Sequence, residues 1–127
     1  REPLFLECTL DETTGEPLTA LAHRSARRVF SAQTARALRE LLASVVTEGT
    51  GHEAAPTEGT AAGKTGTAQT GQFAAGKELK NYWFAGFYPA RNPRYTIVVL
   101  QDGQTGPSRT SAAIFARVCD ALDAAGE

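Results

Sequence analysis

The sequence AGKTGTAQ at residues 62–69 places one cation, two hydroxyl groups and a residue without a side chain within a single short run. Threonine favours extended backbone and glycine disfavours the interior of a helix, so this run predicts a β-strand. Thr65 and Thr67 alternate with Gly66, and alternate side chains of a strand lie on one face. The run therefore predicts a strand edge that presents Lys64 and two aligned hydroxyls, a combination suited to a substrate carboxylate.

The GKT triplet at residues 63–65 also has to be tested as a phosphate-binding loop. That loop requires a glycine, four residues and then Gly-Lys-Ser/Thr, whereas only three residues separate Gly59 from Gly63. A phosphate loop also follows a buried strand and opens a helix, but residues 53–58 are not an apolar strand and residues 65–67 make a poor first helical turn. The spacing argues against a nucleotide site, and an ordinary solvent-facing strand stays open as the alternative.

Length and composition place the chain among ordinary globular proteins. It has 127 residues, of which 42% are hydrophobic and 21% charged, enough for one domain or part of one. The net charge of -1 gives no electrostatic footprint for nucleic acid or an anionic membrane. No apolar run reaches the ~20 residues of a membrane span, and no signal peptide opens the chain. Because it contains no methionine, we expect a processed or excised soluble piece, with anything upstream removed.

The rest of the sequence predicts an α+β fold in which helices pack on an antiparallel sheet. The expected elements are approximately a strand or hairpin over 1–22, a helix over 32–47, a three-strand meander over 62–102 and a helix over 110–125. Three sequential strands joined by short turns indicate antiparallel pairing. The run at 95–100 is nearly continuous in apolar residues, which predicts burial on both faces of that strand.

Local signals set the expected boundaries of these elements. Ser31 suits an N-cap of the first helix and Gly49 suits its C-terminal end. Thr110 or Ser111 suits the N-cap of the last helix. Two glycines within residues 70–80 predict a hairpin connection.

Other conspicuous residues favour structural interpretations. The aromatic residues at 82–88 are expected in the core, Cys8 and Cys119 as small buried side chains, and His23 and His52 at the surface. The two cysteines lie far apart without a CxxC pattern or a histidine at ligand spacing, so we expect neither a metal site nor a cofactor.

The order and spacing of these segments resemble the C-terminal part of the transpeptidase domain of class B penicillin-binding proteins, in the superfamily that includes serine β-lactamases. The resemblance covers roughly residues 28–125 and is strongest at 62–69. It continues through the WFAGFYPA stretch at 83–90, the NPRY stretch at 92–95 and the last helix. It implies that residues 1–127 form a single partial domain, the C-terminal portion of a transpeptidase domain.

The family uses three motifs: Ser-x-x-Lys, which carries the acylated serine and its lysine, Ser-x-Asn, and Lys-Thr-Gly. Only Lys-Thr-Gly is present in this chain. None of the serines is followed by a lysine three residues later, and none begins Ser-x-Asn; they are Ser25, Ser31, Ser44, Ser108 and Ser111. The resemblance therefore implies that the nucleophilic serine and its lysine would precede residue 1. By resemblance, Lys64 would supply positive potential and the backbone N–H of Thr67 would be an oxyanion-hole donor. The substrate-binding residues would be Thr65, Gly66, Thr67, Ala68 and Gln69.

The resemblance implies a serine-type D,D-transpeptidase that cross-links peptidoglycan, with this segment alone inactive. The partners would be stem peptides ending in D-Ala-D-Ala and β-lactam antibiotics. The parent protein would be tethered at the extracytoplasmic face of the bacterial membrane, within a wall-synthesis complex. A β-lactamase, a β-lactam-sensing receptor domain and a fragment without activity stay open as alternatives.

Overall fold

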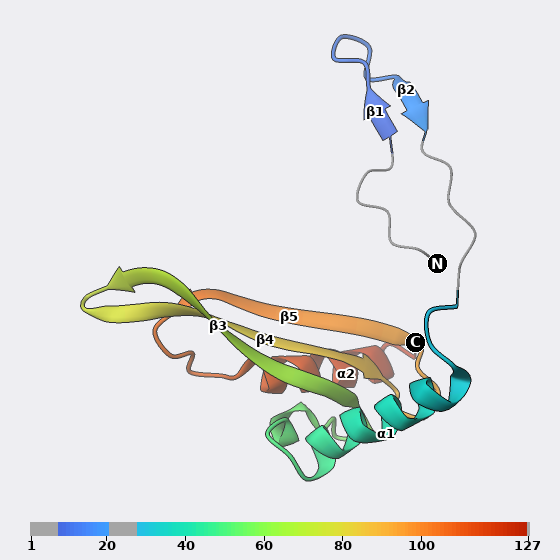
Figure 1. Cartoon of the computed structure of the whole chain (residues 1–127), viewed down its shortest axis with the longest axis vertical. Helices are drawn as coiled ribbons and strands as arrows, with labels where there is room; N and C mark the ends of the chain where they lie inside the picture. The colour runs from blue at the N-terminus through green and yellow to red at the C-terminus, as the bar shows by residue number, and fades with distance from the viewer. Residues whose placement is uncertain (1–7, 21–27, 127) are drawn as a thin grey trace. The chain divides into compact units, whose positions relative to one another are not determined.

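The computed structural model describes residues 8–20 and 28–126, and the chain divides into two compact units, Arg1–Ala32 and Gln33–Glu127 (Figure 1). In the first unit, β1 (Cys8–Leu10) pairs antiparallel with β2 (Pro17–Ala20), which confirms the expected hairpin. Asp11 holds its turn, because Oδ1 accepts from the backbone N–H groups of Thr13 at 2.9 Å and Thr14 at 2.8 Å. These bonds lower the pKa of the Asp11 carboxyl. The predicted strand residues 4–7 and the predicted surface residue His23 lie outside the described ranges.

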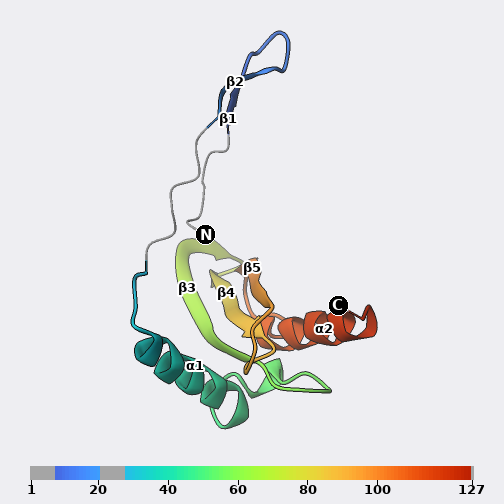
Figure 2. The same cartoon turned by 90° about the vertical axis from the view of Figure 1, so that its right-hand side faces the viewer.

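The second unit is an antiparallel sheet with helices packed around it, as the predicted α+β fold requires. Its elements are α1 (Ala32–Thr47), the 3-10 helix η1 (His52–Ala54), β3 (Ala62–Ala74), β4 (Lys77–Tyr88), β5 (Tyr95–Gln104) and α2 (Ser111–Ala124). The strand order is β3-β4-β5. Figure 2 shows α2 against one face of this sheet, where it contacts β4 and β5.

The core of this unit lies between the sheet and α2. The rings of Phe84 and Phe115 are fully buried, with centroids 4.7 Å apart. Two glycines allow the close approach: a Cβ at Gly63 would lie 2.6 Å from the Phe84 ring, and one at Gly86 would lie 2.5 Å from the carbonyl oxygen of Ala62. The core cluster consists of Val46, Ala54, Ala61, Phe84, Tyr88, Ala112, Phe115 and Cys119. The sequence prediction of core aromatics therefore holds for Phe84 and Tyr88 and is wrong for Trp83, which is 38% exposed.

The far end of α2 is tied to the loop before β3 by hydrogen bonds. The Tyr88 hydroxyl donates to Asp123 Oδ2 at 2.5 Å and lies 3.3 Å from the carbonyl oxygen of Glu58. One turn earlier, Asp120 Oδ1 accepts from the backbone N–H of Thr57 at 2.7 Å. These bonds fix α2 against the segment that leads into β3.

Replacing Tyr88 by phenylalanine is expected to lower the free energy of unfolding by about 1 kcal/mol near neutral pH, because Asp123 loses its donor. The hydrogen bond to Asp123, followed by burial, raises the pKa of Tyr88 from 10.0 to about 12. The neutral phenol is the form favoured in the fold, so this contribution is fully present below the unfolded pKa and is lost as the pH rises towards about 12. Denaturant titrations of both proteins from neutral to alkaline pH measure the difference. A difference that widens above pH 10.0 would contradict this assignment.

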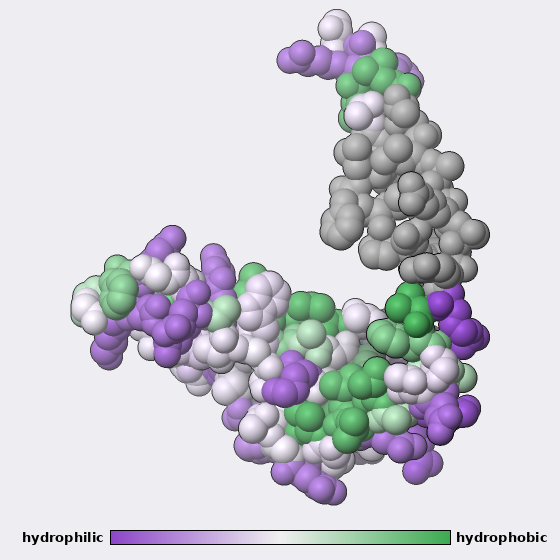
Figure 3. All heavy atoms as spheres, viewed as in Figure 1, coloured by the Kyte–Doolittle hydropathy of each residue, from purple (hydrophilic) through white to green (hydrophobic). Residues whose placement is uncertain are grey.

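The prediction that residues 95–100 are buried on both faces is wrong. Ile97 and Val99 pack on the core, whereas Val98 is 57% and Leu100 43% exposed. The reason is that α2 covers one face of the sheet, and the opposite face, which also carries Trp83 at 38% exposure, has no covering element among the described residues. Figure 3 shows hydrophobic residues gathered on the visible face of this unit.

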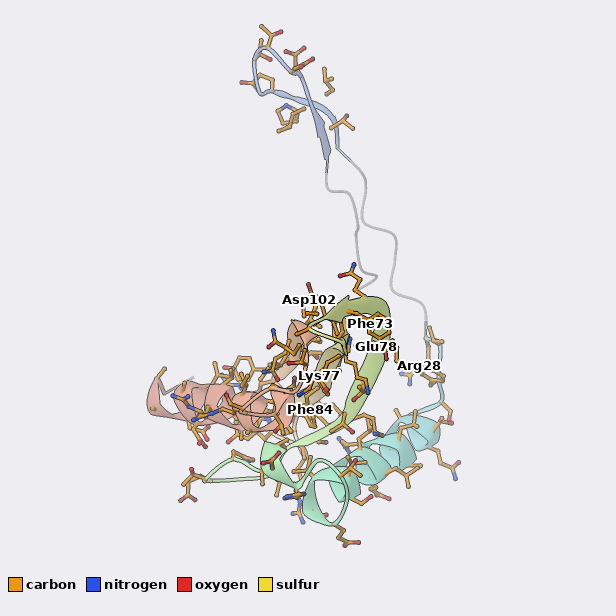
Figure 4. The ribbon with its side chains drawn as sticks, turned by 90° about the vertical axis from the view of Figure 1, so that its left-hand side faces the viewer. Arg28, Phe73, Lys77, Glu78, Phe84 and Asp102 are labelled. Carbon is orange, nitrogen blue, oxygen red and sulfur yellow. The ribbon has the colours of Figure 1, made fainter. Side chains whose placement is uncertain are left out.

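The strands β3 and β4 also run further than predicted. Residues 70–74 and 77–80 belong to β3 and β4, with an irregular register between Gln69 and Phe73, and the connection is only the turn at Ala75 and Gly76, with φ of 49° and 77°. Two positive φ values are typical of the tight turn that matches strand twist, but alanine is an unusual residue there. The hairpin extends past β5, and Phe73, Lys77 and Glu78 come from its end (Figures 1 and 4).

Helix boundaries agree with the sequence more closely. α1 begins directly after Ser31, and α2 begins after Thr110, whose hydroxyl accepts from the backbone N–H of Ala113 at 3.1 Å. Thr110 is therefore the N-cap. No helix in the described ranges is both long and apolar enough to cross a membrane.

Candidate functional site

The run predicted to bind a carboxylate lies on β3, at one edge of the three-stranded sheet. The partner of β3 is β4, with Thr65 opposite Phe84 and Thr67 opposite Tyr82. Within the described part of the chain, no strand pairs with the other edge of β3. An exposed strand edge offers backbone groups to an extended peptide, which can add to it as a further strand.

The Lys64 side chain is exposed and folds back along its own strand. Its Nζ donates to the carbonyl oxygen of Thr65 at 3.1 Å and to Thr65 Oγ1 at 3.0 Å. The ammonium group and the first hydroxyl therefore lie side by side. An anion that approaches Thr65 would meet both a positive charge and a hydrogen-bond donor.

A hollow of about 250 Å³ lies beside this strand. Both Thr65 and Thr67 line it, together with Gly66, so the two threonines open into the same space. The residues that complete its lining are Thr50, Glu53, Tyr82, Trp83, Pro107, Thr110, Ser111 and Ala112. The hollow thus joins β3 and β4 to the loop after α1 and to the start of α2.

The other residues of the run lie differently. Ala68 and Gln69 are exposed and do not line the hollow, and Gln69 Nε2 instead donates to Glu78 Oε2 at 2.8 Å. A Cβ at Gly66 would make ordinary contact with Trp83 at 3.4 Å, so nothing within the described structure forces glycine there. Within the run, Thr65, Gly66 and Thr67 therefore line the hollow, whereas Ala68 and Gln69 continue along the hairpin outside it.

Hydrogen bonds hold the far wall of the hollow in place. Glu53 Oε2 accepts from Thr110 Oγ1 at 2.5 Å, and Ser111 Oγ lies 2.8 Å from the carbonyl oxygen of Tyr82. A carboxylate beside a helix N-terminus is also favoured by the helix dipole. The start of α2 is therefore fixed beneath β3 and β4.

Three residues of this wall were not predicted as site residues: Thr50, Glu53 and Thr110. Thr110 was predicted only as a possible helix N-cap, and Thr50 and Glu53 lie between the predicted helix at 32–47 and the predicted strands from 62 onward. Their contacts join positions 15 and 57 residues apart in the sequence, so no local pattern could have indicated them.

Neither the cysteine nor the histidine in the second unit contributes to the hollow. Cys119 lies in the core, where burial raises the pKa of its thiol to about 11. His52 is exposed at the start of η1. Across residues 8–20 and 28–126, no three His, Cys, Asp or Glu side chains are grouped to hold a metal ion.

Comparison with known proteins identifies the family. The sequence model described as penicillin binding protein transpeptidase domain matches residues 2–120. Penicillin-binding protein PbpB of Mycolicibacterium smegmatis is 38% identical over 110 residues, which cover 75% of this chain and 17% of that protein. The probable peptidoglycan D,D-transpeptidase PenA of Neisseria meningitidis is 39% identical over 83 residues, 62% of this chain and 14% of that protein.

Solved structures of transpeptidase domains are also similar to this chain. The transpeptidase domain of penicillin-binding protein 3 from Burkholderia pseudomallei superposes with a TM-score of 0.65 at 32% identity, covering 91% of this chain and 35% of that one. The chain thus spans less than a fifth of the curated relatives and about a third of that solved domain. From the family match, the sequence identity and the shared fold, this chain belongs to the penicillin-binding protein transpeptidase domain family.

Proposed function

We propose that the protein carrying this chain is a serine-type peptidoglycan D,D-transpeptidase, and that residues 64–67 form its carboxylate-binding strand. The observation that carries the proposal is the shared opening of Thr65 and Thr67 into one hollow at a sheet edge that no other described strand pairs with, with Lys64 Nζ 3.0 Å from Thr65 Oγ1. A cation beside aligned hydroxyls suits a terminal carboxylate, which D-Ala-D-Ala peptides and penicillins both carry.

The substrate in this proposal is a stem peptide that lies extended along the edge of β3. Its terminal carboxylate accepts hydrogen bonds from Thr65 and Thr67, and the Lys64 ammonium supplies positive potential to the carboxylate and to the reacting hydroxyl. The backbone N–H of Thr67 donates to the carbonyl oxygen that becomes an oxyanion. Ala68 and Gln69 contact the peptide further along the strand, outside the hollow.

The nucleophile in this proposal comes from a part of the protein that this sequence does not contain. The serine hydroxyl attacks the carbonyl carbon of the penultimate D-Ala, the peptide C–N bond breaks, and the terminal D-Ala leaves with a proton. An amine of a second stem then attacks the ester and releases the serine. A β-lactam acylates the same serine as its ring opens. None of these steps requires a metal ion or an organic cofactor.

We further propose that the chain is the C-terminal portion of one transpeptidase domain. The uncovered sheet face, with Trp83, Val98 and Leu100, supports this proposal, because a complete domain would bury such a face. The match to about a third of a solved transpeptidase domain supports it as well. By family resemblance, the parent protein would be tethered at the outer face of the cytoplasmic membrane and would act within a wall-synthesis complex.

The proposal is tested by labelling with a fluorescent penicillin. We expect the full protein to form a covalent adduct that survives denaturing electrophoresis and is prevented by unlabelled penicillin. The isolated chain of residues 1–127 is expected to form none, because none of its serines begins Ser-x-x-Lys. A full protein that takes no label would overturn the function, and rapid hydrolytic release of the penicillin would indicate a β-lactamase instead. Labelling of the isolated chain would refute the assignment of the nucleophile.

A further inference from the structure

A third hydroxyl group lies against the carboxylate-binding strand, outside the Lys-Thr-Gly run. Thr50, in the loop that follows α1, places its Oγ1 3.3 Å from Thr65 Oγ1. Thr50 also lines the hollow into which Thr65 and Thr67 open. The hydroxyl of Thr65 therefore has two neighbours, Lys64 on one side and Thr50 on the other.

The backbone on either side of Thr50 is fixed by close packing. A Cβ at Gly49 would lie 2.9 Å from the backbone of Val45, and one at Gly51 would lie 3.0 Å from Val45 Cγ1 and 3.2 Å from the Phe84 ring. Gly51 is buried, and its N–H donates to the carbonyl oxygen of Val45 at 3.0 Å. Gly49 follows the end of α1, as expected, but it does not have a positive φ, and its lack of a side chain matters for packing. The two glycines let the turn press against α1 and the core, which sets the position of Thr50.

The direction of the hydrogen bonds around Thr65 follows from donor and acceptor chemistry. An ammonium group can only donate, so Thr65 Oγ1 accepts from Lys64 Nζ. A hydroxyl has one hydrogen and two acceptor positions. If Thr50 donates to the second acceptor position, the hydrogen of Thr65 is available to a ligand in the hollow; if Thr50 accepts, that hydrogen is held by Thr50. The hydroxyl of Thr50 therefore determines where the Thr65 hydrogen points.

Charge within the hollow determines where a ligand carboxylate can be held. Glu53 lines the far wall, where it accepts from Thr110 beside the start of α2. Its negative charge disfavours a second carboxylate beside it. An anionic ligand is therefore favoured on the β3 side, where the Lys64 ammonium and the Thr50 hydroxyl both lie beside Thr65 Oγ1.

We propose that Thr50 is a positioning residue of the carboxylate-binding strand, which donates to Thr65 Oγ1 so that the hydrogen of Thr65 is directed at the ligand carboxylate. The inference rests on the proposed function, because it assigns the ligand as the carboxylate beside the bond that the serine attacks. Thr50, from the loop after α1, would then act together with residues 64–67 of β3.

The test replaces Thr50 by valine, which keeps the branched shape and removes the hydroxyl, and by serine, which keeps the hydroxyl. In the full protein, Thr50→Val is expected to raise the apparent dissociation constant of a penicillin roughly fivefold to tenfold, as for the loss of one hydrogen bond in a carboxylate site. The rate constant for acylation from the bound state stays nearly unchanged, and Thr50→Ser restores binding. The methyl ester of the same penicillin, which lacks the carboxylate charge, shows no comparable loss.

The matched control is Thr96→Val, at an exposed position of β5 that does not line the hollow. It is expected to leave both constants and the melting temperature as in the unaltered protein. Thr50→Ala provides the same test if valine at position 50 lowers the melting temperature. Equal loss for penicillin and its methyl ester, or no loss in Thr50→Val and Thr50→Ala, overturns the role of Thr50 while the proposed function stands. An unaltered protein that penicillin does not acylate overturns both.

Discussion

Replacing Lys64 by methionine is expected to lower the second-order rate constant for acylation of the full protein by penicillin about 100-fold to 1,000-fold. Methionine keeps an unbranched stem but removes the ammonium group that lies 3.0 Å from Thr65 Oγ1. Removing one charge-stabilising donor from an acyl-transfer site typically has an effect of this size. The measurement is the rate of fluorescent penicillin labelling at several concentrations. Because Lys64 is exposed in this chain, the melting temperature is expected to change little.

The matched control for this prediction is Lys77→Met. Lys77 is also an exposed lysine in the same hairpin, but it begins β4 beside the turn, opposite Ala74. The Lys77→Met variant is expected to be acylated by penicillin at the rate of the unaltered protein. Equal rates for Lys64→Met and the unaltered protein would show that Lys64 has no electrostatic role in the site.

Replacing Phe84 by alanine is expected to lower the free energy of unfolding by about 3–5 kcal/mol, as is typical for a fully buried phenylalanine. The centroid of the Phe84 ring lies 4.7 Å from that of Phe115. The ring also packs closely against Gly63 and Gly51, where a Cβ would lie 2.6 Å and 3.2 Å from it. Its loss leaves a cavity between the sheet and α2 and removes support from the turn that carries Thr50. Denaturant unfolding of the full protein measures the change, and acylation by penicillin is expected to fall as well.

Phe73→Ala is the control, since Phe73 lies in the same hairpin at 69% exposure (Figure 4). It is expected to change the free energy of unfolding by less than about 0.5 kcal/mol. An equal loss in the free energy of unfolding for Phe84→Ala and Phe73→Ala would contradict the placement of Phe84 at the centre of the core.

The elements could be predicted where the signal is local. The helix at 32–47 has apolar residues at three- and four-residue steps, and α1 spans Ala32–Thr47. The meander follows from three strand-like runs separated by turn residues. The hairpin connection at 70–80 was predicted, but its restriction to Ala75 and Gly76 was not, because alanine with a positive φ has no sequence signature. The burial of β5 was overestimated, because an apolar run does not reveal whether a second layer covers the strand.

The site was predictable only along one strand. The alternation of Thr65 and Thr67 predicts a shared face, and both line one hollow. Ala68 and Gln69, predicted from resemblance as substrate-binding, lie outside that hollow and stay predictions. Thr50 and Glu53 reach the site through tertiary packing of a glycine-rich turn and of η1 against α2. Such contacts depend on the fold as a whole, and single-sequence spacing does not contain them.

The most direct test of the central claim is a crystal structure of the full protein acylated by a penicillin. We expect the penicillin carboxylate to lie within hydrogen-bond distance, about 3 Å, of the Thr65 and Thr67 hydroxyls, with the Lys64 ammonium beside it. We also expect the acyl carbonyl oxygen to accept a hydrogen bond from the backbone N–H of Thr67. A covalent adduct whose carboxylate lies away from β3, with Thr65 and Thr67 contacting only protein or water, would contradict the assignment of residues 64–67 as the carboxylate-binding strand.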